Sequence, residues 1–186
     1  MSGCEIKHNI ITISGALGSG KSTIMKMLAN RLGYETYSTG NAQRQIAQKY
    51  GVTTLELNHI ADKNPDIDKE IDGVFATLTQ TGKKYVIDSR LAFFFIPASF
   101  KVKLNVDVNE AAKRVLNDTS RTSEVQCETP EQMASILRER RASEVARFIS
   151  TYDVNIDDES HFDLVVDTTD KTPDEICEII LTALQQ

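Results

Sequence analysis

Short apolar runs that end in polar residues recur along the chain and predict buried strands. Four of them cover residues 9–14 (NIITIS), 83–89 (KKYVIDS), 100–107 (FKVKLNVD) and 161–169 (HFDLVVDTT), and we expect one more strand just before residue 38. Their β-branched content is typical of strands in a parallel sheet, which is buried on both faces. Helical or polar segments separate the runs. The pattern therefore predicts an α/β fold in which helices cover both faces of a five-stranded parallel sheet.

Helix signals lie between these strands. Apolar positions at helical spacing predict a helix over residues 21–33, and a capping threonine followed by proline marks two further helix starts, at Thr129–Pro130 and at Thr172–Pro173. The segment 53–84 has a helical period that is interrupted at Pro65. We expect it to form two helices of a small lobe between the second and third strands.

A glycine-rich stretch, GALGSGKST, joins the first predicted strand to the first predicted helix. It fits the pattern G-x-x-x-x-G-K-[ST] in the context that this pattern requires. Glycines let backbone amides converge on phosphate oxygens, and the helix that follows presents its positive end. We expect Lys21 to reach the β- and γ-phosphates and Ser22 to ligate Mg²⁺. The predicted ATP-binding residues are Gly15, Ala16, Leu17, Gly18, Ser19, Gly20, Lys21, Ser22 and Thr23.

Composition excludes several classes of protein but does not identify the function. The chain has 186 residues, a formal net charge of -6 and three cysteines without a C-x-x-C pair. Non-specific nucleic-acid binding usually needs a basic face, so we expect no nucleic-acid partner, and the cysteine spacing predicts neither a disulfide framework nor a zinc site. No apolar stretch reaches the roughly 18 residues of a membrane span, and no signal-peptide core is present. We expect one cytoplasmic domain over residues 1–186, with no membrane partner.

A triphosphate site alone does not define a reaction. The positions of the arginines indicate where a second substrate binds. The N-K-x-D motif of GTPases is missing; TTDKTPD at 168–174 is the nearest string and does not match. Transfer to a second anion needs cations aimed at the acceptor. Arginines expected in loops beside strand ends are Arg44, Arg90, Arg114 and Arg121.

A charged trio lies on one face of the helix that begins at Pro130. Arg140, Glu144 and Arg147 are spaced four and then three residues apart, which places two guanidinium groups around one carboxylate. Taken alone, such a trio is more often a solvated salt-bridge face. Together with the glycine-rich loop, Arg44 and Arg90, it favours an acceptor site.

Asp88 ends the third predicted strand. It suits the second carboxylate that positions Mg²⁺ or its waters, and we expect it to act there with Ser22. The alternative is that Asp88 only caps the end of its strand.

Five stretches in this order resemble the cytidylate kinases, a family of nucleoside monophosphate kinases. They are ITISGALGSGKST, YSTGNAQR, VIDSRLA, RERRASEVARF and FDLVVDTT, and the similarity runs from about Asn9 to Leu184. The resemblance implies a three-layer α/β/α P-loop kinase fold, a lobe over about 41–82 that binds the monophosphate, and a lid over about 116–132. It also implies a monomer that uses ATP and Mg²⁺ to phosphorylate CMP or dCMP.

The resemblance also implies roles for individual residues. Ser38, Gly40 and Arg44 would line the monophosphate site, and Arg90 would bind the acceptor phosphate. Arg140 and Glu144 would meet the sugar, with Arg147 near the phosphate, and Arg114 and Arg121 would belong to the lid. The candidate catalytic cations are Lys21, Arg114, Arg121 and Arg147.

One position departs from the better-known bacterial cytidylate kinases. There an aspartate that reads cytosine follows the arginine of the third-strand motif, whereas this chain has Leu91, and it lacks a longer acceptor-binding insert. The chain is more similar to the compact branch of the family. Two alternatives stay open: a P-loop kinase for another nucleotide or small metabolite, and an inactive nucleotide-binding regulatory module.

Overall fold

A computed structural model of the protein describes residues 6–52, 56–57, 60, 65–118, 127 and 129–185, with the backbone alone over 65–72. Five strands form one parallel sheet in the order β2-β3-β1-β4-β5. The strands are β1 (Ile10–Gly15), β2 (Glu35–Ser38), β3 (Tyr85–Asp88), β4 (Phe100–Asn105) and β5 (Leu164–Asp167). The predicted five-stranded parallel sheet is confirmed.

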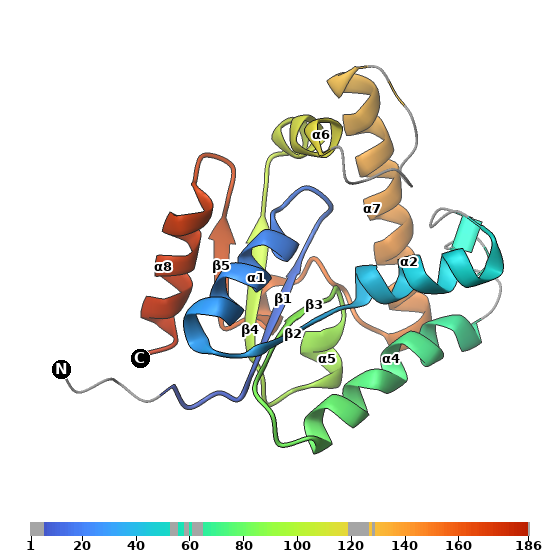
Figure 1. Ribbon diagram of the computed structural model, residues 1–186. Coiled ribbons are helices and arrows are strands. Elements are labelled where there is room, and N and C mark those ends of the chain that lie inside the picture. Colours follow the sequence, from blue (N-terminus) through green and yellow to red (C-terminus); the bar gives the residue numbers. More distant parts are fainter. Residues whose placement is uncertain are drawn as a thin grey trace.

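Helices cover both faces of this sheet (Figure 1). On one face, α1 (Lys21–Leu32) and α8 (Pro173–Ala183) pack on buried residues of the central strands, including Ile11, Ile13 and Leu104. On the other face, α4 (Pro65–Gln80) and the short α5 (Ala92–Phe95) cover Tyr85 and Ile87. The three-layer prediction is therefore confirmed.

The remaining helices frame the carboxyl edge of the sheet. They are α2 (Thr39–Tyr50), α6 (Val108–Asn117) and α7 (Pro130–Tyr152), with a 3₁₀ turn at Glu159–His161. The helices α6 and α7 pack through a small apolar cluster that contains Ala112, Met133 and Leu137. Among the described residues, none of the helices combines the length and the apolar content of a membrane span.

The helix starts follow from side-chain caps. Thr129 Oγ1 accepts from the Gln132 amide at 3.2 Å, with Pro130 in the first turn of α7. At α8, Thr172 and Glu175 form a reciprocal capping box. Both predicted starts are confirmed.

The lobe differs from the prediction at its start. The segment with Arg44, expected as a loop, is the helix α2, because Ser38 caps its first turn and Ala47 is buried against Leu57. The helix α4 begins at Pro65, the expected break. Most of the segment before it, and residues 119–126 and 128 of the expected lid, lie outside the described residues.

Candidate active site

The glycine-rich loop connects β1 to α1 at the carboxyl edge of the sheet. Gly18 and Gly20 have φ values of +83° and +89°, a left-handed backbone that side chains disfavour. The helix α1 begins immediately afterwards, at Lys21, so its positive N-terminal end adjoins the loop. Lys21 Nζ donates to the Ala16 carbonyl at 2.7 Å and so lies across the loop. The loop thus combines backbone donors and a cation, which suits a phosphate chain.

Ser22 and Asp88 are brought together by the pairing of β1 with β3. The Ser22 hydroxyl donates to Asp88 Oδ2 at 2.8 Å, and the Ser38 hydroxyl lies 3.4 Å from the same oxygen. Asp88 is 6% exposed. Hydroxyl and carboxylate oxygens are the ligands that Mg²⁺ prefers, and Mg²⁺ keeps several waters. Within the described residues no cluster of three His, Cys, Asp or Glu side chains could hold a metal. The Ser22–Asp88 pair fits a Mg²⁺ ion that takes its other ligands from phosphate and water.

A cavity of about 520 Å³, here called the loop cavity, opens between the glycine-rich loop and α2. Three basic side chains line it: Lys21, Lys26 and Arg44. Ser38 and Gly40 lie beside Arg44, since a Cβ on Gly40 would be 3.7 Å from Ser38 Oγ and 3.8 Å from Arg44 Nη1. The complete lining is Gly18, Gly20, Lys21, Ser22, Thr23, Met25, Lys26, Asn41, Arg44 and Asp118.

Arg90, Arg140 and Glu144 form a buried charge cluster. Glu144 Oε2 lies 2.7 Å from Arg90 Nε, as an ion pair without the alignment of a hydrogen bond. The other oxygen, Oε1, accepts from Arg140 Nε at 3.3 Å. These side chains are 15%, 19% and 10% exposed, for Arg90, Arg140 and Glu144 respectively. The predicted neighbours Arg140 and Glu144 are thus joined by Arg90, which comes from the end of β3.

Burial and charge oppose each other in this cluster. Burial acts to raise the pKa of Glu144, but the positive charges of Arg90, Arg140 and Arg141 outweigh it, so the pKa lies below its ordinary value of 4.5. Burial also lowers the pKa of Arg90, although the charge of Glu144 acts in the opposite direction. Glu144 is therefore ionised at neutral pH.

A larger cavity of about 670 Å³, here called the arginine cavity, lies between the glycine-rich loop and α7. Ala16 and Leu17 of the loop line it together with Arg90, Arg140 and Glu144. One connected space is therefore bordered both by the loop and by the charge cluster. The loop borders both cavities, the arginine cavity through Ala16 and Leu17 and the loop cavity through Gly18, Gly20, Lys21 and Ser22.

Arg147 and Leu91 lie outside the linings of these two cavities. The Arg147 guanidinium packs over the Phe148 ring, with its carbon 5.2 Å from the ring centroid, and Arg147 lines neither of these two cavities. Leu91 is 4% exposed and belongs to an apolar cluster with Phe93 and Ile156. Arg121 lies outside the described residues.

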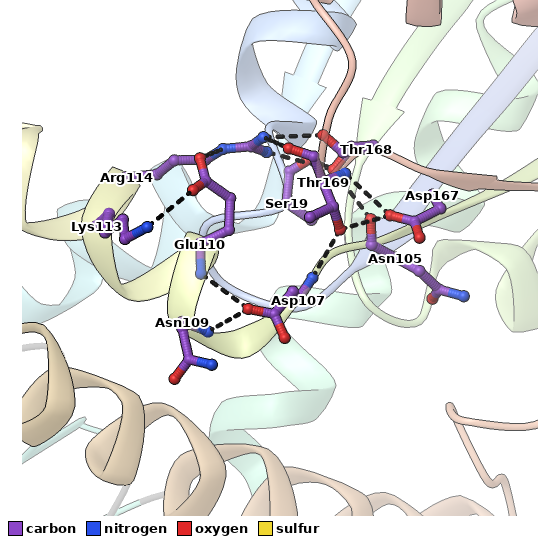
Figure 2. A network of polar contacts seen from close by, with 10 residues as sticks. All are labelled: Ser19, Asn105, Asp107, Asn109, Glu110, Lys113, Arg114, Asp167, Thr168 and Thr169. Carbon is purple, nitrogen blue, oxygen red and sulfur yellow. Dashed lines mark hydrogen bonds and ion pairs between the residues drawn. The ribbon is translucent and has the colours of Figure 1, made fainter.

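Arg114, expected in a lid, is part of α6 and is engaged in a polar network (Figure 2). Its Nη2 donates to the carbonyls of Thr168 and Thr169, each at 2.8 Å, and its Nε donates to Glu110 at 3.1 Å. It also borders a third cavity of about 320 Å³, which is lined by Gly18, Ser19 and Gly20 of the glycine-rich loop and by Lys171 and Pro173. In this arrangement Arg114 holds the turn after β5 and does not reach the loop cavity.

Sequence reasoning missed the residues that hold the turn after α7 beside the arginine cavity. Arg141 forms an ion pair with Asp157, and both line the arginine cavity. Buried Lys103 donates to the Asp157 carbonyl at 2.8 Å. The RERR string could have suggested Arg141, but no local pattern joins it to Asp157.

Comparisons with known proteins agree with this geometry. Residues 10–170 match the cytidylate kinase-like family. A cytidylate kinase of Sulfurisphaera tokodaii is 36% identical over 173 residues, which cover 92% of each chain. An S-adenosylmethionine-dependent nucleotide dehydratase of Lacinutrix mariniflava is 35% identical over 177 residues, but this chain spans only 36% of that protein's length. The structure of shikimate kinase from Acinetobacter baumannii with shikimate has a TM-score of 0.59 at 21% identity, covering 95% of this chain and 93% of that one.

Proposed function

Because the chain belongs to the cytidylate kinase-like family, we propose that it transfers the γ-phosphoryl group of ATP to CMP or dCMP. The observation that carries the proposal is the arginine cavity, which the glycine-rich loop and the Arg90–Glu144–Arg140 cluster border together. The same loop also lines the loop cavity with Lys21 and Ser22, so it lies beside both the donor phosphates and an acceptor held by the cluster. The products are ADP and the nucleoside diphosphate.

The donor site is formed by the loop. Amides of Gly18 to Lys21 bind the phosphates, and the Lys21 ammonium neutralises charge on the β- and γ-phosphoryl groups. Ser22 and Asp88 would hold Mg²⁺ or its waters, and the support for this is their 2.8 Å contact. When bound, Mg²⁺ would neutralise charge on the donor phosphates.

The acceptor site is formed by arginines from three elements. Arg44 on α2 lines the loop cavity beside Ser38 and Gly40, and Arg90 at the end of β3 lines the arginine cavity; both bind the acceptor phosphate. In the free protein Glu144 neutralises Arg90, so the acceptor phosphate replaces part of that contact. The Glu144 carboxylate then becomes available to a sugar hydroxyl.

The reaction depends on alignment. An oxygen of the acceptor phosphate, already ionised at neutral pH, bonds to the γ-phosphorus as the bond to the β–γ bridging oxygen breaks. No general base is needed. The chain contributes by holding both phosphates in line and by neutralising the charge of the migrating group.

A second candidate is a kinase for a non-nucleotide acceptor. Two observations favour it: Leu91 is buried away from the cavities, and a shikimate kinase shares the fold. The third candidate is a regulatory module that binds a nucleotide but catalyses no phosphoryl transfer. Each gives a different result in one assay.

That assay measures ADP formation from ATP and Mg²⁺ with CMP, dCMP, UMP, AMP, GMP and shikimate as acceptors. We expect the highest kcat/KM with CMP or dCMP. Turnover of shikimate with inert monophosphates would establish the second candidate. Tight ATP binding without turnover of any acceptor would establish the third.

Arg44→Ala tests the placement of the acceptor. We expect kcat/KM for CMP to fall about 100-fold, since one charged contact to the transition state is lost, while the KM for ATP stays within about threefold. Lys49→Ala, an exposed cation on the same helix α2, is the matched control. Equal kinetics for the two variants would show that the acceptor does not bind at Arg44. Lys21→Ala should instead lower turnover with every acceptor.

A further inference from the structure

A buried hydroxyl group touches the loop from the opposite end of the chain. Thr168 follows β5 and is 0% exposed. Its Oγ1 lies 3.3 Å from the Ser19 carbonyl oxygen of the glycine-rich loop, 2.9 Å from the Asn105 carbonyl oxygen and 3.3 Å from Arg114 Nη1 (Figure 2). One side chain therefore joins the loop, the end of β4 and α6.

The surroundings direct the single hydroxyl proton of Thr168. Arg114 is only a donor, so it takes a lone pair of Oγ1 and leaves the proton for a carbonyl. The Asn105 carbonyl already accepts from the Thr168 amide at 2.9 Å. Among the described residues, the Thr168 hydroxyl is the donor that the structure places on the Ser19 carbonyl. The hydroxyl donates to the Asn105 carbonyl at 2.9 Å and to the Ser19 carbonyl at 3.3 Å in a three-centre arrangement, so part of this bond holds the loop.

Fixing the Ser19 carbonyl also fixes the next amide. The described chain has no cis peptide bond, and in a planar trans peptide the C=O and N–H vectors point in opposite directions. With Ser19 O directed at Thr168, the Gly20 N–H points away from Thr168. Gly20 lines the loop cavity beside Lys21 and Ser22, and it also lines the third cavity, which Arg114 borders. Gly20 has no side chain to resist rotation of this peptide, so an external contact must hold it.

Thr168 is itself held in place. Arg114 Nη2 bonds the carbonyls of Thr168 and Thr169, and Arg114 is anchored by Glu110 on its own helix. Thr169 Oγ1 accepts from the Asp107 amide at 2.9 Å. The turn after β5 is thus fixed to α6 at both ends, which makes it a rigid support for the loop.

We propose that Thr168 is a positioning residue for the donor phosphates: its hydroxyl holds the Ser19–Gly20 peptide so that the Gly20 amide faces the loop cavity. The inference rests on the proposed function in taking the bound anion to be ATP. It adds a residue of the β5–α8 turn to the determinants of donor binding.

The test compares Thr168→Val, which keeps the shape and removes the hydroxyl, with Thr168→Ser, which keeps the hydroxyl. We expect Thr168→Val to raise the KM and the Kd for ATP about five- to tenfold, the range of one net hydrogen bond, and to leave the KM for CMP within about twofold. Thr168→Ser should recover most of the loss. In ¹⁵N-glycine-labelled protein, ADP should shift the Gly20 amide resonance less in Thr168→Val than in wild type.

A matched variant separates positioning from general damage to the fold. Thr169→Val removes the bonds to Asp107 and Asp167 from the same turn but leaves the Ser19 contact. It should lose a similar amount of thermal stability without a change in ATP affinity. The inference is overturned if Thr168→Val binds ATP as wild type does, or if both variants weaken ATP and CMP equally.

The proposed function and this inference can fail separately. ATP affinity is measured by calorimetry without an acceptor, so it tests Thr168 even if no monophosphate is phosphorylated. If wild type phosphorylates CMP and Thr168→Val binds ATP with unchanged affinity, the inference is overturned and the proposed function stands.

Discussion

Glu144 lies between the guanidinium groups of Arg90 and Arg140, and this contact decides the charge of the acceptor site in the free protein. An unpaired buried arginine would be costly, and two arginines facing each other would repel. The carboxylate therefore stabilises the free state and keeps both arginines in place for an anion. The same ion pairs make stability depend on pH.

The pH dependence has a defined sign. The pKa of Glu144 in the folded chain lies below its ordinary value of 4.5, so its contribution is fully present above that pH and is lost as the pH falls through the lower, folded value. We expect the free energy of unfolding of wild type to fall on acidification below pH 4.5, and Glu144→Gln to flatten this part of the curve. Removing one partner of a buried pair should also cost about 3 to 5 kcal/mol at pH 7.

Urea denaturation between pH 3 and 7 measures both effects. Glu178→Gln is the control, because Glu178 pairs with Arg31 on the surface and its side chain is 69% exposed. We expect that variant to change stability by less than about 1 kcal/mol. Parallel pH curves for wild type and Glu144→Gln would contradict the assigned pKa direction.

At the scale of elements, the loop is shaped by the helix beside it as well as by its own glycines. A Cβ on Gly18 would lie 2.8 Å from the Ala111 carbonyl oxygen and 2.9 Å from its Cα, both on α6. Such distances cannot be relieved by a side-chain rotation, because the obstacle is backbone. The end of the loop at Gly20 has open space instead.

This contrast gives a matched pair of variants. Gly18→Ala and Gly20→Ala both place a side chain at a similar φ, +83° and +89°, so both incur a backbone penalty of about 1 to 2 kcal/mol. Only Gly18→Ala must also move α6. We expect it to lose at least about 2 kcal/mol more than Gly20→Ala in chemical denaturation. Equal losses would show that the loop moves away from α6 without cost.

Local patterns explain which elements were predictable. The glycine-rich loop and the Thr172 cap are each defined by residues that are close in the sequence, so the sequence alone is sufficient to predict them. The helix α2 was missed because its first turn contains Thr39, Gly40 and Asn41, which are weak helix formers; the Ser38 cap and tertiary packing decide its state. The helix α5 has four residues, too few for a helical period to appear.

The site was predictable only in part for a related reason. Sequence reasoning assigned Ser22 and Asp88 to one Mg²⁺ site because Ser22 belongs to the glycine-rich motif and Asp88 ends the third predicted strand. The contacts of Arg90 with Glu144, and of Thr168 with Ser19, join segments that no spacing relates. Such contacts follow from the packing of α7 and of the β5–α8 turn.

At the scale of the whole molecule, stability reports the occupancy of the site, because the folded state alone binds the ligand. ATP at about 100 times its Kd should add about 2.7 kcal/mol and raise the Tm by roughly 5 to 10 °C. If Ser22 and Asp88 hold Mg²⁺, the shift should be larger with Mg²⁺ than with EDTA. Asp88→Asn should make the two shifts equal.

Differential scanning fluorimetry measures these shifts. Asp163→Asn serves as the control. The Asp163 carboxylate accepts from the Lys101 amide near the start of β4, at the end of the strand away from the glycine-rich loop. It should keep the Mg²⁺-dependent increment. An increment that survives in Asp88→Asn would place the metal elsewhere.

The position of β1 has a consequence for how the chain is made. This strand is central, and its two partners are residues 85–88 and 100–105, so a ribosome must add some ninety residues after β1 before both edges of that strand are covered. Until then an apolar strand with open edges is exposed on the growing polypeptide. Nascent chains that stop before β4 therefore cannot complete the sheet, and they are the species on which chaperones and proteases would act.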